Sequence, residues 1–344
     1  MNSPPTLIEK AEQLHTLSRD EAESLMEELL SGQIATPNIV RLLLALNRRP
    51  VTAVELSAFA RVMRRHAAPV FLRESDRPGH MVDTCGTGGD GQGTFNISTA
   101  AAFVASAGGA HVAKHGNRSV SSRSGSADVL EAAGIRIDLP LEECGRAIRE
   151  LGIGFLFAPA AHAATRYAVA ARKQIGHRTV FNLLGPLTNP AGAHSQILGV
   201  FAESLMDLLA ETLVELGVER AYVVHGLGGL DEISLVGETQ VAEVRNGVIR
   251  RFTVTPEDFS VPAASLEALQ GGTPQENAAI IRDIFEGQVS PRRDVVVANA
   301  AAALVVTGIA GDFREGAAIA SRALSSGAAL HKLDQLREFT NRGC

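Results

Sequence analysis

A glycine-rich segment is the first part of this sequence whose residue types and spacing could do chemistry. It runs V-D-T-C-G-T-G-G-D-G-Q-G-T-F-N-I-S-T over residues 82–99, with five glycines between Gly86 and Gly93. Glycine adopts positive φ angles and lets a ligand approach the main chain closely. Ser98 or Thr99 is placed to cap a helix over about 99–107, and an exposed helix N-terminus attracts phosphate. We interpret the segment as an anion site, and a simple tight turn is the alternative.

A second polar segment adds positive charge further along the chain. It runs H-V-A-K-H-G-N-R-S-V-S-S-R-S-G-S over residues 111–126 and contains Lys114, Arg118 and Arg123. Two segments rich in hydrogen-bond donors suit a polyanionic ligand that is held by its phosphates. The glycine spacing is not that of a Walker A loop, and the acidic residue of a dinucleotide fingerprint is missing. The pattern alone therefore leaves the chemistry of the ligand open.

An adjacent pair of acids forms the third feature. Asp231 and Glu232 lie in the stretch G-L-G-G-L-D-E-I-S over residues 226–234, directly after an apolar run. Magnesium is commonly bound by one or two carboxylates together with substrate phosphates. The pair could hold such a cation at the end of a strand, although most adjacent acids are simply solvated surface residues.

The first 70 residues carry only helical patterns. Capping boxes at Ser18 and Thr52 each predict the start of a helix, and so does the cap-then-proline pair at 36–37. With an amphipathic stretch at 7–14, they predict four short helices in a small helical domain. The apolar faces of these helices could also form a dimer surface.

From residue 81 the pattern changes to short apolar runs that alternate with helices. The expected strands are 81–83, 111–114, 135–137, 153–158, 196–201 and 221–225, and the helices between them include 128–133, 141–151 and 203–216. This alternation predicts an α/β domain with a mainly parallel central sheet covered by helices, and ligands at the carboxyl ends of the strands. Asn246-Gly247 predicts an added antiparallel hairpin. Thr273-Pro274 and Ser290-Pro291 each predict a further helix, and two more helices close the chain.

Composition excludes several classes of protein. The 344 residues allow two domains, and three cysteines do not suggest a disulfide framework. No basic-then-apolar leader begins the chain and no apolar run has the length of a membrane span, so we expect a cytoplasmic protein without a membrane partner. A net charge of −6 gives no basic stripe, so we expect no nucleic-acid partner.

The ordered blocks of the sequence resemble those of the anthranilate phosphoribosyltransferases. The matching blocks are G-T-G-G-D at 86–90, N-I-S-T at 96–99, K-H-G-N-R at 114–118, S-G-S-A-D at 124–128, R-T-V-F-N-L-L-G-P-L-T-N-P at 178–190 and G-L-D-E-I-S at 229–234. The likeness covers the whole chain, and several separately spaced blocks are more specific than one glycine pattern. The chain departs at Gly228, where many members carry aspartate.

The resemblance implies a reaction in tryptophan biosynthesis. The amine of anthranilate attacks C1 of 5-phosphoribosyl 1-pyrophosphate, and pyrophosphate leaves. It also implies a homodimer that forms through the helical domain. The segment 164–185, which we expect to be a long helical stretch, is implied to return to that domain. The domains are then 1–72 with 164–185, and 73–163 with 186–344.

The resemblance also implies the site residues. The donor-binding residues are Gly86, Gly89, Asp90, Thr94, Asn96, Ile97, Ser98, Thr99, Lys114, His115, Gly116, Asn117, Arg118, Ser119, Val120, Ser121, Ser122 and Ser126. The anthranilate-binding residues are Gly86, His115, Asn117, His162 and Arg172. Two Mg²⁺ ions per monomer are held by Ser98, Asp231 and Glu232. Judged without the resemblance, the histidines would be structural or surface residues and Arg172 part of a solvated face.

Two other functions remain as alternatives. Pyrimidine nucleoside phosphorylases share the two-domain plan but act on phosphate and a nucleoside, and their lysine-containing block differs from K-H-G-N-R. A non-catalytic relative that binds nucleic acid is the other alternative, and the net acidic charge and the acidic pair argue against it.

Overall fold

The structure is a computed structural model that describes residues 3–70, 72, 79–119 and 123–342. It begins with a helical bundle made of α1 (Pro4–Glu12), α2 (Arg19–Leu30), α3 (Thr36–Asn47) and α4 (Ala53–Arg65). The capping boxes predicted at Ser18 and Thr52 are both present. The prediction that Thr36 caps α3 is wrong, because Ala35 is the N-cap and Thr36 is the first helical residue. The following proline then occupies the second position, where its missing N–H costs no hydrogen bond.

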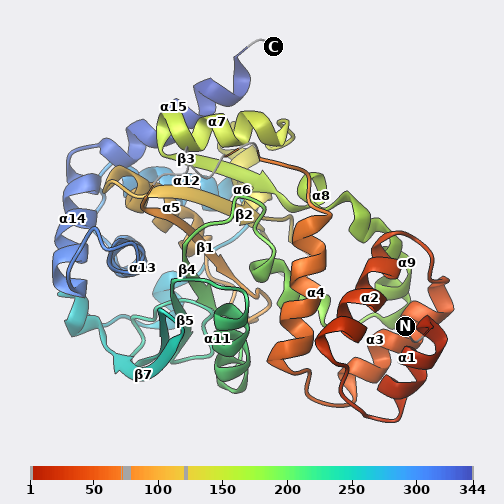
Figure 1. Cartoon of the computed structure of the whole chain (residues 1–344). Coiled ribbons are helices and arrows are strands. Elements are labelled where there is room, and N and C mark those ends of the chain that lie inside the picture. Colours follow the sequence, from red (N-terminus) through yellow and green to blue (C-terminus); the bar gives the residue numbers. More distant parts are fainter. Residues whose placement is uncertain (1–2, 71, 73–78, 120–122, 343–344) are drawn as a thin grey trace.

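A seven-stranded, mainly parallel sheet forms the centre of the molecule (Figure 1). Its order is β3-β2-β1-β4-β5-β6-β7, and the β5/β6 and β6/β7 pairs are antiparallel while the other pairs are parallel. The strands are β1 (Met81–Gly86), β2 (His111–Gly116), β3 (Ile153–Phe157), β4 (Ser195–Gly199), β5 (Arg220–Gly226), β6 (Thr239–Arg245) and β7 (Val248–Val254). The predicted hairpin at Asn246-Gly247 is confirmed. The chain leaves β1 on one side and returns to β4 on the other, which makes the β1/β4 boundary the switch point of the sheet.

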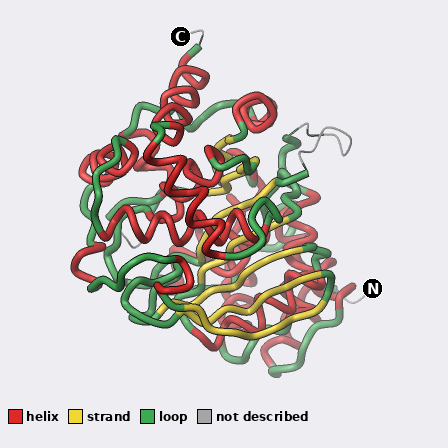
Figure 2. Tube along the Cα trace, turned by 90° about the vertical axis from the view of Figure 1, so that its left-hand side faces the viewer, coloured by secondary structure: helices red, strands yellow, loops and turns green. Residues whose placement is uncertain are grey.

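Helices cover both faces of this sheet (Figure 2). On one face α5 and α13 lie against the strands, with α14 and α15 packed around them, and on the other face α7 covers β2 and β3 and α11 covers β5 and β6. The helices are α5 (Ile97–Ala107), α6 (Ser126–Ala132), α7 (Leu141–Leu151), α8 (Ala158–Ala161), α9 (Arg166–Ile175), α10 (Phe181–Leu184), α11 (Met206–Glu215), α12 (Pro274–Phe285), α13 (Pro291–Val306), α14 (Phe313–Ser325) and α15 (Ala328–Asn341). Short 3₁₀ turns are η2 (Ala163–Thr165), η3 (Gly185–Leu187), η4 (Glu203–Leu205), η5 (Pro256–Phe259) and η6 (Leu266–Leu269).

One hydrophobic core runs from the helical bundle into the second face of the sheet. It joins apolar residues of α1 to α4 with those of α11, β4, β5 and β6. Helix α4 packs on α11, and α9 packs on α2 and α3, so a segment more than a hundred residues later completes the bundle (Figure 1). The side chain of Arg19 pairs with Glu215 at 2.5 Å across the same junction. The bundle is therefore fixed against the α/β part by both apolar and charged contacts.

Two expected elements differ from the structure. Residues 135–137 are not a strand: Ile135 and Ile137 are buried, but the Arg136 N–H donates to the Thr340 hydroxyl of α15 at 3.2 Å. Apolar alternation produced this error, because the edge beside β2 is already occupied by β3. The expected long helical segment at 164–184 is broken, since α9 ends at Gly176 with a φ of +70° and α10 is a separate short helix. Among the described residues, no helix is both long enough and apolar enough to span a bilayer.

Candidate active site

The candidate site lies where the parallel strands end. Strands β1, β2, β4 and β5 all end on glycine, at Gly86, Gly116, Gly199 and Gly226. In the register of the sheet Gly86 is the direct partner of Gly199, so two of these glycines meet at the switch point. The glycine-rich loop starts there, at the edge where α/β sheets bind ligands.

Three consecutive residues of the loop are each held by a different element. The Thr87 N–H donates to the Gly199 carbonyl of β4 at 2.8 Å. The Gly88 N–H donates to Asp231 Oδ2 at 2.9 Å. The Gly89 carbonyl accepts a hydrogen bond from Arg178, which lies between α9 and α10. The loop is thus fixed by the sheet, by the acidic pair and by the segment that follows α9.

The acidic pair lies directly on the ends of the strands. A Cβ at Gly199 would be 1.6 Å from the Asp231 carbonyl, and one at Gly86 would be 2.4 Å from Asp231 Oδ2. Only glycine allows this close approach. The far side of the acidic loop is held by Asn299 of α13, whose side-chain amide exchanges two 3.0 Å hydrogen bonds with the backbone of Ile233. The amide is buried within the otherwise apolar stretch 295–306 of α13, which indicates that it positions this loop.

Helix α5 begins beside the second acid. Its first residue is Ile97 and its N-cap is Asn96, so the expectation that Ser98 or Thr99 caps it is wrong. The Asn96 side chain makes no cap hydrogen bond and instead bonds to Ser124 at 3.1 Å, joining the two donor-rich segments. The Ser98 N–H donates to Glu232 Oε1 at 3.0 Å. The side chains of Ile97 and Thr99 are buried, so these two residues can offer a ligand only their backbone.

The ionised forms of Asp231 and Glu232 are disfavoured by their surroundings, and a bound cation would stabilise them. Burial and the nearby charge of Asp90 raise the pKa of Asp231, and burial and the charge of Asp231 raise the pKa of Glu232. Oxygen Oδ2 of Asp90 is buried, and no described residue forms a hydrogen bond with it. Carboxylates and a serine hydroxyl are hard oxygen donors, the kind that Mg²⁺ binds. The residues present therefore fit a divalent cation that is shared with a phosphate ligand.

The second donor-rich segment begins at the end of β2. Lys114 is buried, and its ammonium donates to the Thr84 carbonyl at 2.6 Å and lies 3.5 Å from the Ser98 hydroxyl. Burial lowers its pKa, while the charges of Asp83 and Glu232 oppose that shift. The ammonium is thus brought to the N-terminus of α5, next to the acidic pair.

The loop after β2 closes on itself around Asp128. One oxygen of Asp128 accepts from the Ser119 and Gly125 N–H groups at 2.9 and 2.8 Å. Arg118 forms a two-pronged pair with Glu131, at 2.5 and 2.8 Å, and a contact of 3.1 Å with Asp128. The guanidinium expected at the donor is therefore engaged with two acids in this conformation.

The remaining residues expected at the donor lie along the same two segments. Gly116 ends β2, and a Cβ there would meet the Ser126 hydroxyl at 2.1 Å. Asn117 is exposed, and its carbonyl accepts from the Ser126 hydroxyl at 3.3 Å. Thr94 pairs with Gln270 in an isolated antiparallel bridge. Val120, Ser121 and Ser122 lie outside the described residues.

Two histidines meet on the bundle side of the site. The rings of His115 and His162 form an edge-to-face pair with centroids 5.2 Å apart. Burial lowers the pKa of His115 to about 3 and that of His162 to about 4, and Arg64 of α4 adds to both shifts. Each Nε2 is buried and has no hydrogen-bond partner among the described residues. Both rings are therefore neutral at pH 7 and have a free nitrogen to offer a polar ligand.

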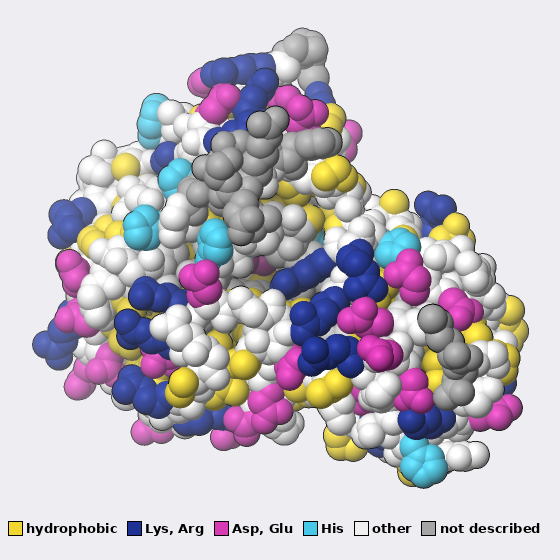
Figure 3. Space-filling model, viewed as in Figure 1, with side chains coloured by type: hydrophobic (Ala, Val, Ile, Leu, Met, Phe, Trp, Pro, Cys, Tyr) yellow, Lys and Arg dark blue, Asp and Glu magenta, His cyan; other side chains and the backbone are white. Residues whose placement is uncertain are grey.

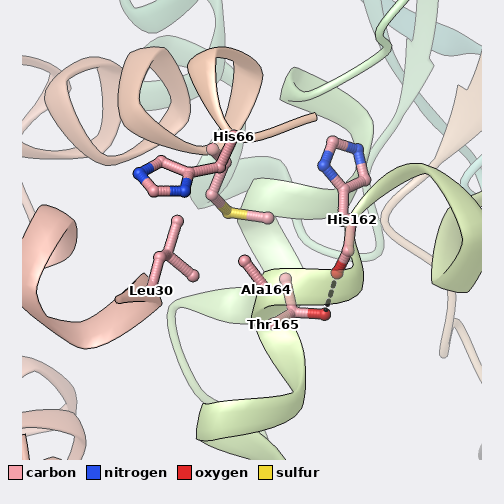
Figure 4. A pocket seen from close by; sticks show the side chains of 6 residues that line it. Leu30, His66, His162, Ala164 and Thr165 are labelled. Atoms are coloured by element: carbon pink, nitrogen blue, oxygen red, sulfur yellow. Dashed lines mark hydrogen bonds between the residues drawn. The ribbon is translucent and has the colours of Figure 1, made fainter. Parts of the chain in front are cut away.

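His162 lies at the junction of the two parts of the molecule. Figure 4 shows it facing a small hollow whose lining also includes Leu30 and His66 of the bundle. Its carbonyl accepts from the Thr165 hydroxyl at 2.7 Å (Figure 4). Figure 3 shows Lys and Arg side chains gathered over α4, where the two parts meet; this helix carries Arg61, Arg64 and Arg65.

Arg172 is the expected site residue that the structure leaves most separate. It is partly buried on α9, and its guanidinium lies over the ring of Phe181, 5.3 Å from the centroid. Arg64 and Asn299 near the site were not found from the sequence, and Arg178, which begins the matching block 178–190, was given no role there. Arg64 has no local signal beyond its charge on a helix, whereas Asn299 could have been noticed as the one amide inside the apolar run of 295–306.

Comparisons with known proteins agree with this geometry. The model of the "Glycosyl transferase family, a/b domain" matches residues 78–330, and that of the "Glycosyl transferase family, helical bundle domain" matches residues 5–67. The chain is 49% identical to the anthranilate phosphoribosyltransferase of Desulfatibacillum aliphaticivorans, over 97% of this chain and 98% of the relative. The chain belongs to the anthranilate phosphoribosyltransferase family. Its activity is that of this family, a pentosyl transfer in tryptophan biosynthesis.

Solved anthranilate phosphoribosyltransferases have the same fold. The crystal structure of the Thermus thermophilus enzyme superposes with a TM-score of 0.91 at 45% identity, covering 97% of this chain and 99% of that one. The Saccharomyces cerevisiae enzyme in complex with PRPP and Mg superposes with a TM-score of 0.89 at 27% identity, covering 98% of each chain. The yeast enzyme has also been solved in complex with 4-fluoroanthranilate. The two-part architecture, with a helical bundle and a mainly parallel sheet, is thereby confirmed.

Proposed function

We propose that the site at the β1/β4 switch point transfers the phosphoribosyl group of 5-phosphoribosyl 1-pyrophosphate to the amine of anthranilate. The observation that carries this assignment is the meeting of the glycine-rich loop, the N-terminus of α5 and the acidic pair within hydrogen-bond distance of one another. Backbone N–H groups, a buried lysine and a cation held by acids together match a pyrophosphate group. The yeast relative's complex with PRPP and Mg supports the same ligand here.

The donor is bound, in this proposal, by the two donor-rich segments. The loop from Gly86 to Thr94, the turn 96–99, residues 114–122 and Ser126 line it, as the resemblance implies. Arg118 would leave Glu131 to reach a phosphate, because both of its outer nitrogens are now engaged. Ser98, Asp231 and Glu232 would hold two Mg²⁺ ions per monomer, and the bound ions would neutralise the charge of the departing pyrophosphate.

The chain's own residues act by positioning and by electrostatics. The anthranilate amine has a free lone pair at neutral pH, so attack on C1 of the ribose needs no protein nucleophile. Neutral His115 and His162 offer nitrogen atoms without taking up protons at pH 7, which suits a pocket for an uncharged amine. Lys114 stabilises negative charge on the leaving group while remaining hydrogen-bonded to the end of β1.

The acceptor is held, in this proposal, by Gly86, His115, Asn117, His162 and Arg172. Arginine pairs with a carboxylate through two parallel hydrogen bonds and stays charged at all relevant pH values. Burial lowers the pKa of the Arg172 guanidinium. Among the residues that the structure describes, its guanidinium stacks on the ring of Phe181 and forms no salt bridge, so the carboxylate of anthranilate would supply the missing acidic partner.

Assembly and domain boundaries complete the proposal. We divide the chain into a helical domain, 1–72 with 164–185, and an α/β domain, 73–163 with 186–344. Leu14, Leu44 and Val54 are exposed apolar side chains of the helical part, which supports a homodimer through this domain. We place the enzyme in the cytoplasm, where its pathway operates.

One assay tests the activity and separates it from the alternatives. The loss of anthranilate fluorescence is followed after the donor and MgCl₂ are added to the protein. The proposal expects magnesium-dependent loss with release of pyrophosphate. Phosphate-dependent cleavage of a pyrimidine nucleoside without this activity would favour a nucleoside phosphorylase, and no turnover of either pair would favour a non-catalytic relative.

A further inference from the structure

Arg178 connects the helical bundle to the glycine-rich loop. Its backbone carbonyl accepts a hydrogen bond of 2.8 Å from the side-chain amide of Asn47, the last residue of α3. The same amide lies 3.4 Å from Nδ1 of His177. The backbone of Arg178 is therefore tied to the bundle, although it lies 131 residues later in the chain.

The side chain of Arg178 reaches in the other direction. It donates a hydrogen bond to the carbonyl of Gly89, in the middle of the glycine-rich loop. Its guanidinium carbon lies 3.8 Å from the ring centroid of Phe201, which follows β4. The Phe201 N–H donates to the Thr87 hydroxyl at 3.3 Å, so the residue that Arg178 stacks on is itself bonded to the glycine-rich loop, two residues before Gly89. A guanidinium stacked on an aromatic face loses little mobility when it also donates a hydrogen bond.

Gly89 is shaped to receive this arginine. Its φ of +74° is rare for residues with a side chain, and a Cβ there would lie 2.6 Å from Nη2 of Arg178. Both the backbone angle and the space beside it require glycine at this position. The contact thus depends on a glycine in the loop and on the position of Arg178 in the segment after α9.

We propose that Arg178 is a positioning residue that couples the acceptor half of the site to the donor half. It deepens the proposed function, because it rests on the assignment of the glycine-rich loop to the donor and of Arg172 to the acceptor. Arg172 lies six residues before Arg178, at the end of the helix that leads into it. Anthranilate bound at Arg172 fixes the position of the segment 172–178. The hydrogen bond from Arg178 to the carbonyl of Gly89 then fixes the position of the glycine-rich loop. Each ligand therefore strengthens the binding of the other by the same factor.

Binding of pyrophosphate in the presence of MgCl₂, measured by calorimetry with and without saturating anthranilate, tests the coupling. This pair cannot react, because no ribose is present. We expect anthranilate to tighten pyrophosphate binding by about fivefold or more in the wild-type enzyme. Arg178→Ala should reduce this factor to about one while pyrophosphate still binds. Asn47→Ala should also reduce the coupling factor. Asn47 acts on the segment that carries Arg178 and is not one of the residues that we assign to either ligand.

Lys173→Ala is the matched control, because it removes an exposed cation from α9, the helix that leads into Arg178, and should leave the coupling intact. Arg178→Lys keeps the charge but loses the planar stack on Phe201, so we expect only partial coupling. The inference is overturned if wild-type enzyme shows no coupling or if Arg178→Ala retains it. A loss that follows Arg178→Ala but not Asn47→Ala would also overturn it, since it would indicate direct ligand contact. Failure of the wild-type enzyme to bind pyrophosphate would instead refute the proposed donor site itself.

Discussion

Replacing Gly86 by alanine should disable the site without changing the backbone. Gly86 ends β1 and is not among the glycines with positive φ, so alanine can adopt its conformation. The added Cβ, however, would lie 2.4 Å from Asp231 Oδ2 and 3.0 Å from its Cγ. Real Cβ atoms do not approach so closely, so the carboxylate must move. The substitution therefore acts on Asp231, rather than on a phosphate that contacts the loop directly.

The structure sets the size of the effect. Displacing Asp231 breaks its 2.9 Å hydrogen bond from the Gly88 N–H and moves a proposed cation ligand. A hydrogen bond to a charged group contributes about 1.5–3 kcal/mol. If that contribution is lost from the bound state, affinity for magnesium pyrophosphate falls by about 10- to 150-fold. The melting temperature should change little, because burial and the charge of Asp90 already disfavour the ionised form of Asp231 where it lies, so moving its carboxylate loses little stability.

Calorimetry with magnesium pyrophosphate measures this loss, and turnover with the full donor gives the corresponding change in KM. Gly79→Ala is the matched control, since Gly79 lies just before the same strand and no atom of the described residues lies within 4 Å of the position of its Cβ. The double variant with Asp231→Asn should bind no more weakly than Asp231→Asn alone, because the two changes act on one group. Wild-type affinity in Gly86→Ala, or full additivity in the double variant, would refute the reasoning.

Three further predictions concern the cation, the acceptor and pH. The double variant Asp231→Asn with Glu232→Gln should fold but lose most magnesium-dependent turnover; an unchanged magnesium titration would remove the pair from the mechanism. Arg172→Ala should raise the KM for anthranilate about ten- to a hundredfold with donor binding nearly intact, and Arg172→Lys should recover only part of the loss; damage to donor binding instead would contradict this division of the site. The pKa values of His115 and His162, about 3 and about 4, lie below the ordinary 6.5. The unfolded state therefore binds more protons than the folded state between pH 6.5 and about 4. As the pH is lowered through this range, the free energy of unfolding decreases by about 1.4 kcal/mol per pH unit for each histidine. Urea unfolding at pH 7 and pH 5 should show a smaller loss in His162→Gln, and an equal loss would show that the ring is protonated in the folded enzyme.

Local patterns predicted helices and turns well where the residues that determine the element are close together in the sequence. A capping box such as that of Ser18 needs only residues three positions apart, and the Asn246-Gly247 turn carries its own backbone preference. The same local reasoning failed at residues 135–137, because an apolar run shows burial but not the partner that buries it. It also failed at the start of α5, where Asn96 bonds to Ser124 in place of its own helix.

The sequence by itself determined the family and the two-part architecture, and it named the segments that we propose carry the chemistry. These predictions depend on the order of sequence blocks or on short-range periodicity, both of which can be read directly from the sequence. Only the tertiary structure decided that Asp231 holds the glycine-rich loop, that Glu131 engages Arg118, and that Arg178 spans the junction. Such contacts join residues up to 143 positions apart, and their energy depends on distances of a few tenths of an ångström. A sequence states which donors and acceptors exist, but the packing of the sheet and the helices determines which of them meet.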